Sequence, residues 1–172
     1  MVFIFMFILL TVYVLYMKII LSNRRESVKK DWLQIDMLLK KRNDLIPSLI
    51  DITKDYFLEE EAINNIRSAR NNVLSSKSKK DKMKNSNKLT SELGHLFSIT
   101  ERFSDLKNNS EFIDIQSRLH DTEDQINNSR RRYNNKVLDY THKLDMFPFK
   151  IVAKVFNYKP EDYFDEEEIL EL

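Results

Sequence analysis

The chain has 172 residues, the length of about one domain. Its single glycine and its lack of cysteine exclude disulfides and thiol chemistry, and leave almost no residue suited to tight hairpin turns or phosphate-binding loops. The 28 basic residues nearly balance the 27 acidic ones, for a formal net charge of +1, so no global charge favours nucleic acid as a partner. We therefore expect an all-α fold.

The amino-terminal segment is strongly apolar. No residue from Met1 to Met17 is charged, and after Lys18 the apolar run resumes as far as Leu21. These 21 residues reach about 31 Å as a helix, which crosses a hydrocarbon core if Lys18 extends its ammonium group to the headgroups. The basic leader and small-residue cleavage site of a signal peptide are both lacking. We expect residues 1–21 to form a transmembrane helix in contact with membrane lipid; the alternative is a buried core helix.

Positive charge follows this segment on one side. Glu26 is the only acidic residue among the basic residues that come next, which are Lys18, Arg24, Arg25, Lys29 and Lys30. By the positive-inside rule the amino terminus faces outward and the rest of the chain is cytoplasmic, as in a single-pass membrane protein. These side chains could also attract anionic lipid, at about 1 kcal/mol each, but topology already explains them.

Large apolar residues then recur at alternating steps of four and three. They are Val28, Trp32, Ile35, Leu39, Ile46, Leu49 and Tyr56, and Arg42 and Thr53 occupy the two remaining positions of the series. This spacing is typical of a helix seam packed against other long helices. It predicts a helix over Asn23–Asp55, bent near Asp44 because Pro47 removes a backbone hydrogen bond. Because the pattern continues to Val73, we expect Trp32–Val73 to form the first rod of a bundle.

A second rod is predicted further along the chain. Leu74–Asn87 loses the periodicity and is interpreted as a solvated connection or frayed helix ends. A shorter helix is expected over Lys88–Lys107, and the turn at Asn108–Ser110 offers a cap to the next helix. The seam returns over Glu111–Asp145, about 52 Å of helix. We thus expect residues 22–160 to form an elongated antiparallel bundle of three to four long helices.

The end of the chain has a different character. Pro148 stops the long helix, because the residue before a proline disfavours helical geometry. Lys150–Phe156 can form a short apolar helix, which Pro160 ends. In residues 161–172, seven of twelve side chains are acidic. We expect a mobile or loosely docked acidic tail there.

Four blocks of sequence, taken in order, resemble the LemA family. They are Trp32 with Ile35, Asp36, KKRNDLIPSL at Lys40–Leu49, Tyr56, Ala69 and Arg70; DLKNNSEF at Asp105–Phe112; TEDQI and SRRRYNN within Thr122–Asn135; and FPFKIVAKVFNYKPEDYF at Phe147–Phe164. The resemblance spans Val28 to Phe164. It departs from the family over Leu74–Asn87, where the family tends to alanine and glycine.

The resemblance implies an amino-terminal membrane helix, a cytoplasmic bundle of long helices and no established enzymatic activity. Some members of the family are implicated in organising bacterial membranes, including magnetosome membranes. The expected function is therefore a non-catalytic scaffold or adaptor, anchored in the membrane, with protein partners of unknown identity and possible self-association.

One cation interrupts the predicted seam. Arg42 occupies a seam position, and a buried cation without a carboxylate would be very costly. The candidate partners are Glu123 and Asp124 on the later helix, and Asp36 and Asp44 on its own helix. We interpret the pair as a device that fixes helix register, with ligand binding as the alternative, and we assign it no catalytic role.

Three consecutive arginines, residues 130–132, do not predict nucleic-acid binding. Consecutive helical residues point about 100° apart, so the three guanidinium groups cannot form one basic face. No aromatic platform or glycine-rich loop accompanies them.

The one enzyme alternative is a dinuclear metal centre in the bundle. Glu92 with His95, and Asp139 with His142, have the carboxylate-x-x-His spacing of di-iron bundles. Both pairs lie on the flank of the predicted seam, and His120 is expected to be exposed. No Ser-His-Asp constellation is visible. We therefore predict no catalytic, cofactor-binding or metal-ligating residue, and no enzyme activity.

Overall fold

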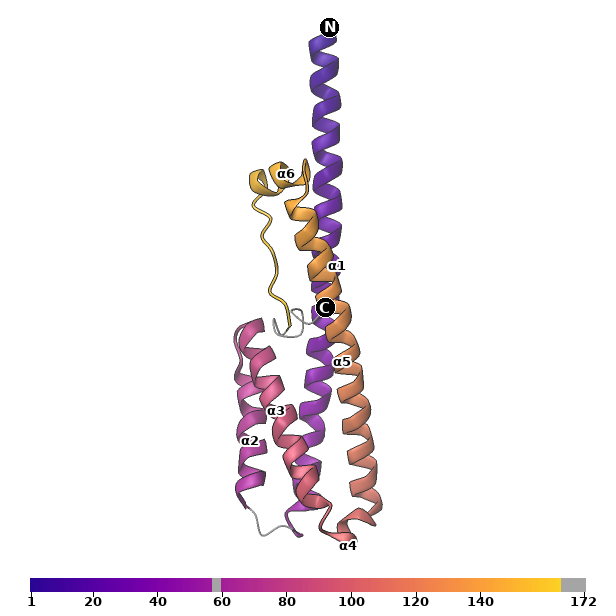
Figure 1. The fold of residues 1–172 in the computed structure, drawn as a ribbon, viewed down its shortest axis with the longest axis vertical. Helices are drawn as coiled ribbons and strands as arrows, with labels where there is room; N and C mark the ends of the chain where they lie inside the picture. The colour runs from indigo at the N-terminus through magenta and orange to yellow at the C-terminus, as the bar shows by residue number, and fades with distance from the viewer. Residues whose placement is uncertain (57–59, 165–172) are drawn as a thin grey trace. The chain divides into compact units, whose positions relative to one another are not determined.

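The computed structural model describes residues 1–56 and 60–164, which form six helices and no strand (Figure 1). The helices are α1 (Val2–Thr53), α2 (Glu60–Ser75), α3 (Lys79–Thr100), α4 (Ser104–Lys107), α5 (Ser110–Asp145) and α6 (Phe149–Val155). The all-α prediction is confirmed. The chain divides into two compact units, to which both α1 and α5 contribute. The central unit is Ile35–Asn128, and the terminal unit combines Met1–Gln34 with the chain from Ser129 onward.

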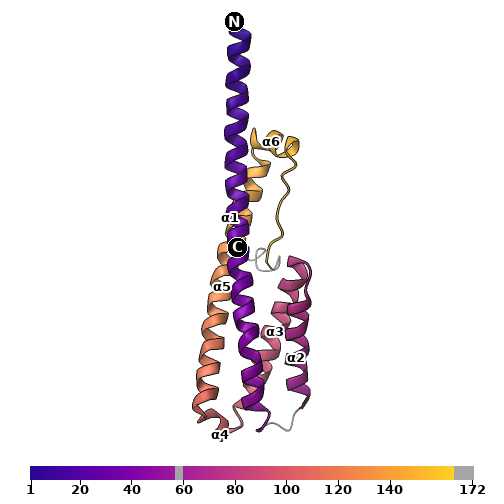
Figure 2. The same cartoon turned by 180° about the vertical axis from the view of Figure 1, so that it is seen from behind.

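The central unit is a helical bundle with one continuous apolar core. Successive helices reverse direction, and α2 packs along α3 (Figures 1 and 2). All five helices of this unit contribute to the core, through residues that include Ile46, Leu49, Ile66, Leu89, Leu96, Leu106, Phe112 and Leu119. Burying each such side chain stabilises the fold by about 1.5 to 3 kcal/mol relative to leaving it exposed.

The predicted first rod, Trp32–Val73, is wrong as one continuous helix. α1 continues through Pro47 but ends at Thr53, whose hydroxyl donates to the Leu49 carbonyl at 2.8 Å. α2 runs back along α1, and Arg70 Nε donates to the Asn43 carbonyl at 2.8 Å. The seam spacing could not show this reversal, because a straight rod and a folded one present the same apolar stripe. The predicted bend near Asp44 stays a prediction.

The prediction of a solvated connection or frayed helix ends over Leu74–Asn87 is correct for residues 76–78 but wrong from Lys79 onward. α3 begins at Lys79, with the Ser78 hydroxyl accepting a hydrogen bond from the Asp81 amide at 3.0 Å. Met83 and Ser86 are buried within this stretch. The buried face of α3 therefore begins about two turns earlier than predicted. The sequence pattern concealed it, because the buried Ser86 is small and polar and is surrounded by lysines. At its other end α3 stops at Thr100, short of the predicted Lys107, and the short α4 follows.

The boundaries of the later helices agree with prediction. α5 begins at Ser110, and the Asn109 side-chain oxygen accepts hydrogen bonds from the amides of Glu111 and Phe112 at 2.9 and 3.1 Å. α5 ends at Asp145 as expected. α6 lies within one residue of the predicted Lys150–Phe156.

The terminal unit has its own core around the carboxyl-terminal segment. Its buried residues include Met17, Leu21, Val28, Tyr133, Val137, Tyr140, Leu144, Val152 and Phe164. The acidic tail predicted for residues 161–172 therefore begins with a firmly docked stretch, because Phe164 is completely buried. Residues 165–172 lie outside the described residues.

The start of α1 differs from every other helix in its exposure. From Val2 to Tyr16 nearly all side chains are apolar and exposed. Among the described residues, this helix is the one candidate that is long and apolar enough to span a membrane, and only 11% of its apolar window is buried. A core helix of a soluble protein would have most of that window covered.

Candidate functional site

Arg42 forms the centre of a polar cluster inside the central unit. Its side chain is 1% exposed, and its Nη1 donates to Glu123 Oε2 at 2.6 Å and to Thr90 Oγ1 at 2.8 Å. Nη2 donates to the Ser86 hydroxyl at 2.9 Å and to the Ser86 carbonyl at 3.2 Å. The cluster of Arg42, Ser86, Thr90 and Glu123 thus links α1, α3 and α5, and confirms the prediction that a carboxylate neutralises Arg42.

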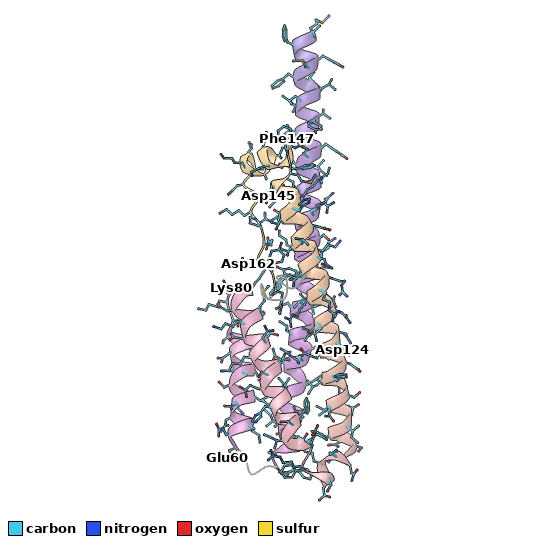
Figure 3. All side chains as sticks on the ribbon, viewed as in Figure 1. Glu60, Lys80, Asp124, Asp145, Phe147 and Asp162 are labelled. Carbon is cyan, nitrogen blue, oxygen red and sulfur yellow. The ribbon has the colours of Figure 1, made fainter. Side chains whose placement is uncertain are left out.

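The other candidate carboxylates lie elsewhere. Asp36 accepts a hydrogen bond from Lys82 Nζ at 2.6 Å, near the surface. Asp44 is exposed, and Asp124 is exposed on α5 (Figure 3), where its carboxylate lies 3.9 Å from His120 Nε2.

The helix geometry of α3 explains why two small hydroxyl residues reach Arg42. Ser86 and Thr90 are four residues apart, so they lie on the same face of α3. Thr90 Oγ1 also lies 3.2 Å from Glu123 Oε1 and 3.2 Å from the Ser86 carbonyl. Both carboxylate oxygens of Glu123 therefore contact other side chains of the cluster.

A cavity of about 460 Å³ adjoins this cluster between α3 and α5. Its lining comprises Thr90, Leu93, Gly94, Phe97, Gln116, Ser117, Leu119, His120 and Glu123. A β-carbon added at Gly94 would meet no atom within 4 Å, so the glycine faces open space. Glu123, with 22% of its side chain exposed, is the charged group that borders both the cavity and Arg42. Sequence reasoning missed this cavity, although an isolated glycine inside a helix was a signal for it.

The four residues of the metal alternative are divided between the two units. Glu92 and His95 lie on α3 of the central unit, whereas Asp139 and His142 lie on α5 of the terminal unit. The carboxylate of Asp139 is 3.7 Å from Arg24 Nη1. Within residues 1–56 and 60–164, no three His, Asp or Glu side chains are grouped to hold a metal ion. The structure therefore does not favour the metal alternative.

The three consecutive arginines have separate surroundings. The guanidinium group of Arg130 stacks over the Phe164 ring at 4.4 Å, and Arg132 Nη2 donates to the Ser129 hydroxyl at 2.8 Å. Arg131 is exposed. These positions agree with the prediction that the three side chains do not share one face.

A second polar cluster holds the carboxyl-terminal segment in the terminal unit. Asn134 donates from Nδ2 to the Phe164 carbonyl and accepts from the Phe164 amide, both at 2.8 Å. The Tyr133 hydroxyl donates to the Asp162 carbonyl at 2.8 Å, and the Trp32 ring lies 5.8 Å from that of Tyr133 and 6.5 Å from that of Phe164. We call Trp32, Tyr133, Asn134 and Phe164 the aromatic clasp.

Burial raises the pKa of Tyr133, and the charges of Glu161 and Asp162 raise it further. The folded state therefore keeps this phenol protonated at a pH where the unfolded chain, with a pKa of 10.0, has lost the proton. The contribution of the protonated Tyr133 phenol to the free energy of unfolding is fully present below pH 10 and is lost as the pH rises above it. We expect the free energy of unfolding, measured by urea titration of the full chain in detergent, to fall above pH 10.

The Tyr133→Phe variant loses the hydrogen bond to Asp162, so its free energy of unfolding at neutral pH should be lower by about 0.5 to 1.5 kcal/mol. Above pH 10 its free energy of unfolding should fall less steeply than that of the unaltered chain. Tyr56→Phe, in the central unit, removes a phenol outside the terminal unit and is the matched control. A decline above pH 10 that is equally steep in the Tyr133→Phe variant would contradict the assignment.

Two comparisons with known proteins bear on these clusters. A protein-family model described as LemA family matches residues 31–171. The matched region contains the whole Arg42 cluster and the aromatic clasp, and it begins after the apolar segment of α1. No curated protein matches the chain.

Proposed function

The chain belongs to the LemA family, and from that premise we propose that it is a non-catalytic scaffold or adaptor anchored in a bacterial inner membrane by residues 1–21. The observation that carries this proposal is that the apolar side chains at the start of α1 are exposed, whereas those of the central unit are buried in its core. Exposed apolar surface of this extent marks a membrane or protein contact in other proteins.

The chemistry of the segment supports lipid as the contact. The eleven Val, Phe, Ile and Leu residues within Met1–Met17 favour insertion by about 3 to 7 kcal/mol. Thr11 is the polar residue that sits furthest inside the run, and its hydroxyl donates to the Phe7 carbonyl at 2.9 Å. The hydroxyl is thereby satisfied within its own helix, as a lipid environment requires.

The orientation follows from the flanking charges. The basic residues that begin at Lys18 lie on one side of the apolar run, so the amino terminus faces outward and the bundle lies in the cytoplasm. Arg24 and Arg25 lie within 3.7 and 3.6 Å of Asp139 and Glu161, in ion pairs that join the end of the anchor to α5 and the carboxyl-terminal segment of the terminal unit.

The proposed mechanism is confinement. A protein partner held by an anchored bundle is restricted to the membrane surface, which raises its effective concentration without any chemical step. Self-association of the bundle would act in the same way. The Arg42 cluster supports a non-catalytic role, because both oxygens of its carboxylate are engaged by other side chains of the cluster.

Removing residues 1–21 should move the chain from the membrane fraction to the soluble fraction. The reason is that the deletion removes the exposed apolar side chains from Val2 to Tyr16. The measurement is immunoblotting of fractionated bacteria after a carbonate wash, which strips proteins held by charge alone. A bundle that stays in the washed membranes without the segment would contradict the proposal.

The same pair of chains tests the scaffold role. Partners captured from detergent-solubilised membranes with the full chain should be lost when residues 1–21 are missing. If both chains capture the same partners, membrane placement does not select them.

A further inference from the structure

The second apolar surface of the terminal unit lies on α6 and its flanks. Its exposed residues are Met146, Phe147, Ile151, Val155 and Phe156. Phe147 and Val155 are 80% and 72% exposed, and Figure 3 labels Phe147 beside α6. Ile151 and Val155 are four residues apart and share one face of the helix. The opposite face carries the buried Val152 and Ala153, so α6 is apolar on both sides and covered on one.

This surface lies beside the end of the anchor. Figures 1 and 2 both show α6 next to α1. The Lys18 ammonium group lies 4.7 Å from the centre of the Phe156 ring, and the Tyr158 hydroxyl is 3.5 Å from the Lys18 carbonyl. Met17 and Leu21 are buried, whereas Ile19 between them is exposed. The anchor is therefore covered by protein along one side of its last turn.

The thickness of a bilayer sets the depth of this contact. Val2–Tyr16, the part of α1 that no other element covers, is about 22 Å long, which is shorter than a hydrocarbon core of about 30 Å. Val2–Leu21 reaches about 30 Å and matches it. If the anchor spans the membrane, Met17 and Leu21 lie at the inner edge of the core. The residues of the terminal unit that cover them then lie at that depth too.

The charge of the segment fits an anionic lipid surface. Residues 146–160 contain three lysines, Lys150, Lys154 and Lys159, and no acidic residue. Asp145, just before them, lies 3.9 Å from Lys150 Nζ in an exposed ion pair, whereas no acidic side chain lies within 4 Å of Lys154 among the described residues. Lys150 and Lys154 are exposed on α6. A short helix with apolar residues on its free side and lysines near them has the composition of segments that lie in the interface of a bilayer.

We propose that residues 146–156 are a second membrane contact, in which the free face of α6 inserts into the lipid interface of the leaflet where α1 emerges. Ile151, Val155 and Phe147 enter the acyl boundary, while Lys150 and Lys154 meet anionic headgroups. This inference rests on the proposed anchoring by residues 1–21. It adds that the terminal unit is held to the membrane at two points, residues 1–21 and the free face of α6.

The test uses the absence of cysteine from the chain. The full chain is labelled through Val155→Cys with an environment-sensitive fluorophore and reconstituted in phosphatidylcholine vesicles with or without phosphatidylglycerol. Lipids that carry a spin label near the headgroup should quench this label. Phe7→Cys is the control for the anchor. Ile113→Cys, an exposed apolar position of the central unit, is the control for the bundle.

The outcomes separate the inference from the anchoring. Quenching at positions 7 and 155 but not at 113 supports the second contact. Quenching at position 7 alone overturns it and leaves the anchor intact, whereas no quenching at position 7 overturns the anchor itself. Energy transfer between Val155-labelled copies without lipid quenching would assign the surface to a second copy of the chain and would also overturn the proposal.

Charge and apolar contacts are tested by further substitutions. Lys150→Gln and Lys154→Gln should each lower the equilibrium constant for docking of α6 on the lipid about five-fold in vesicles containing phosphatidylglycerol. Quenching of the label at position 155 measures this docking, and in phosphatidylcholine alone both changes should have little effect. Ile151→Asp should abolish the quenching, and Ile113→Asp, its matched control, should leave it unchanged. Both positions are exposed, so neither change disturbs the core. Equal quenching in all four variants would overturn the proposal.

Discussion

Replacing Glu123 with leucine should lower the free energy of unfolding by about 3 to 5 kcal/mol. The change removes the carboxylate that lies 2.6 Å from Arg42, whose side chain is 1% exposed. The guanidinium group keeps its charge, as arginine side chains do in proteins. Urea unfolding of the full chain in detergent, followed by circular dichroism, measures the loss.

The converse change should cost less. Arg42→Met leaves the Glu123 carboxylate, which is partly exposed and borders the cavity, so water can replace the lost hydrogen bonds. The double variant should recover part of the loss of Glu123→Leu, because apolar side chains that replace a whole buried ion pair are often tolerated. Only a double-mutant cycle isolates this coupling.

The pair of Asp36 and Lys82 supplies the matched control. It also joins α1 to α3 at 2.6 Å, but its side chains are 41% and 26% exposed. Asp36→Asn should therefore cost less than about 1 kcal/mol. If Glu123→Leu costs no more than Asp36→Asn, the buried arginine does not stabilise the bundle, and the ligand-binding interpretation of the cluster gains support.

The elements that sequence reasoning predicted well are those with a long, regular apolar stripe. α5 was placed within one residue at each end, because its stripe is regular and Asn109 provides a local cap. The partner of Arg42 was narrowed to four carboxylates on the ground that a buried cation needs one. Choosing Glu123 among them required the register of α5 against α1, which no local pattern encodes.

The elements that were wrong share a different cause. The reversal after Thr53 and the early start of α3 depend on which apolar helix face packs against which other helix. At Ser86 a small polar residue occupies the core because Arg42 needs a hydroxyl there. Composition alone assigned that stretch to solvent. The lysines around Ser86 are exposed or half-buried, so the average polarity of the segment concealed its buried face.

The aromatic clasp was not predicted as a unit. Asn134 bonds to the backbone of Phe164, 30 residues further along the chain. A contact at that separation leaves no periodicity in the sequence. The acidic residues around Phe164 instead predicted a loosely docked tail. That prediction was based on their charge and took no account of Phe164, the one aromatic residue whose burial docks the segment.

Phe164→Ala should therefore detach the carboxyl-terminal segment and lower the free energy of unfolding by about 3 to 5 kcal/mol. The ring is completely buried, lies 6.5 Å from that of Trp32 and carries the Arg130 guanidinium group on its face at 4.4 Å. Trp32 is the only tryptophan, so its fluorescence reports on this site directly. We expect its emission to shift to longer wavelength as water reaches the indole.

The neighbouring side chain provides the control for this change. Tyr163 is half-buried, and Tyr163→Ala should cost less and leave the emission of Trp32 near its original wavelength. Asn134→Ala should also lower the free energy of unfolding, by about 1 to 3 kcal/mol, because it leaves the amide and carbonyl of Phe164 without their side-chain partner. Unchanged Trp32 emission in both the Phe164 and the Asn134 variants would show that the clasp does not hold the segment. A shift in both, with the helical circular dichroism retained, would show that the segment detaches while the helices stay folded.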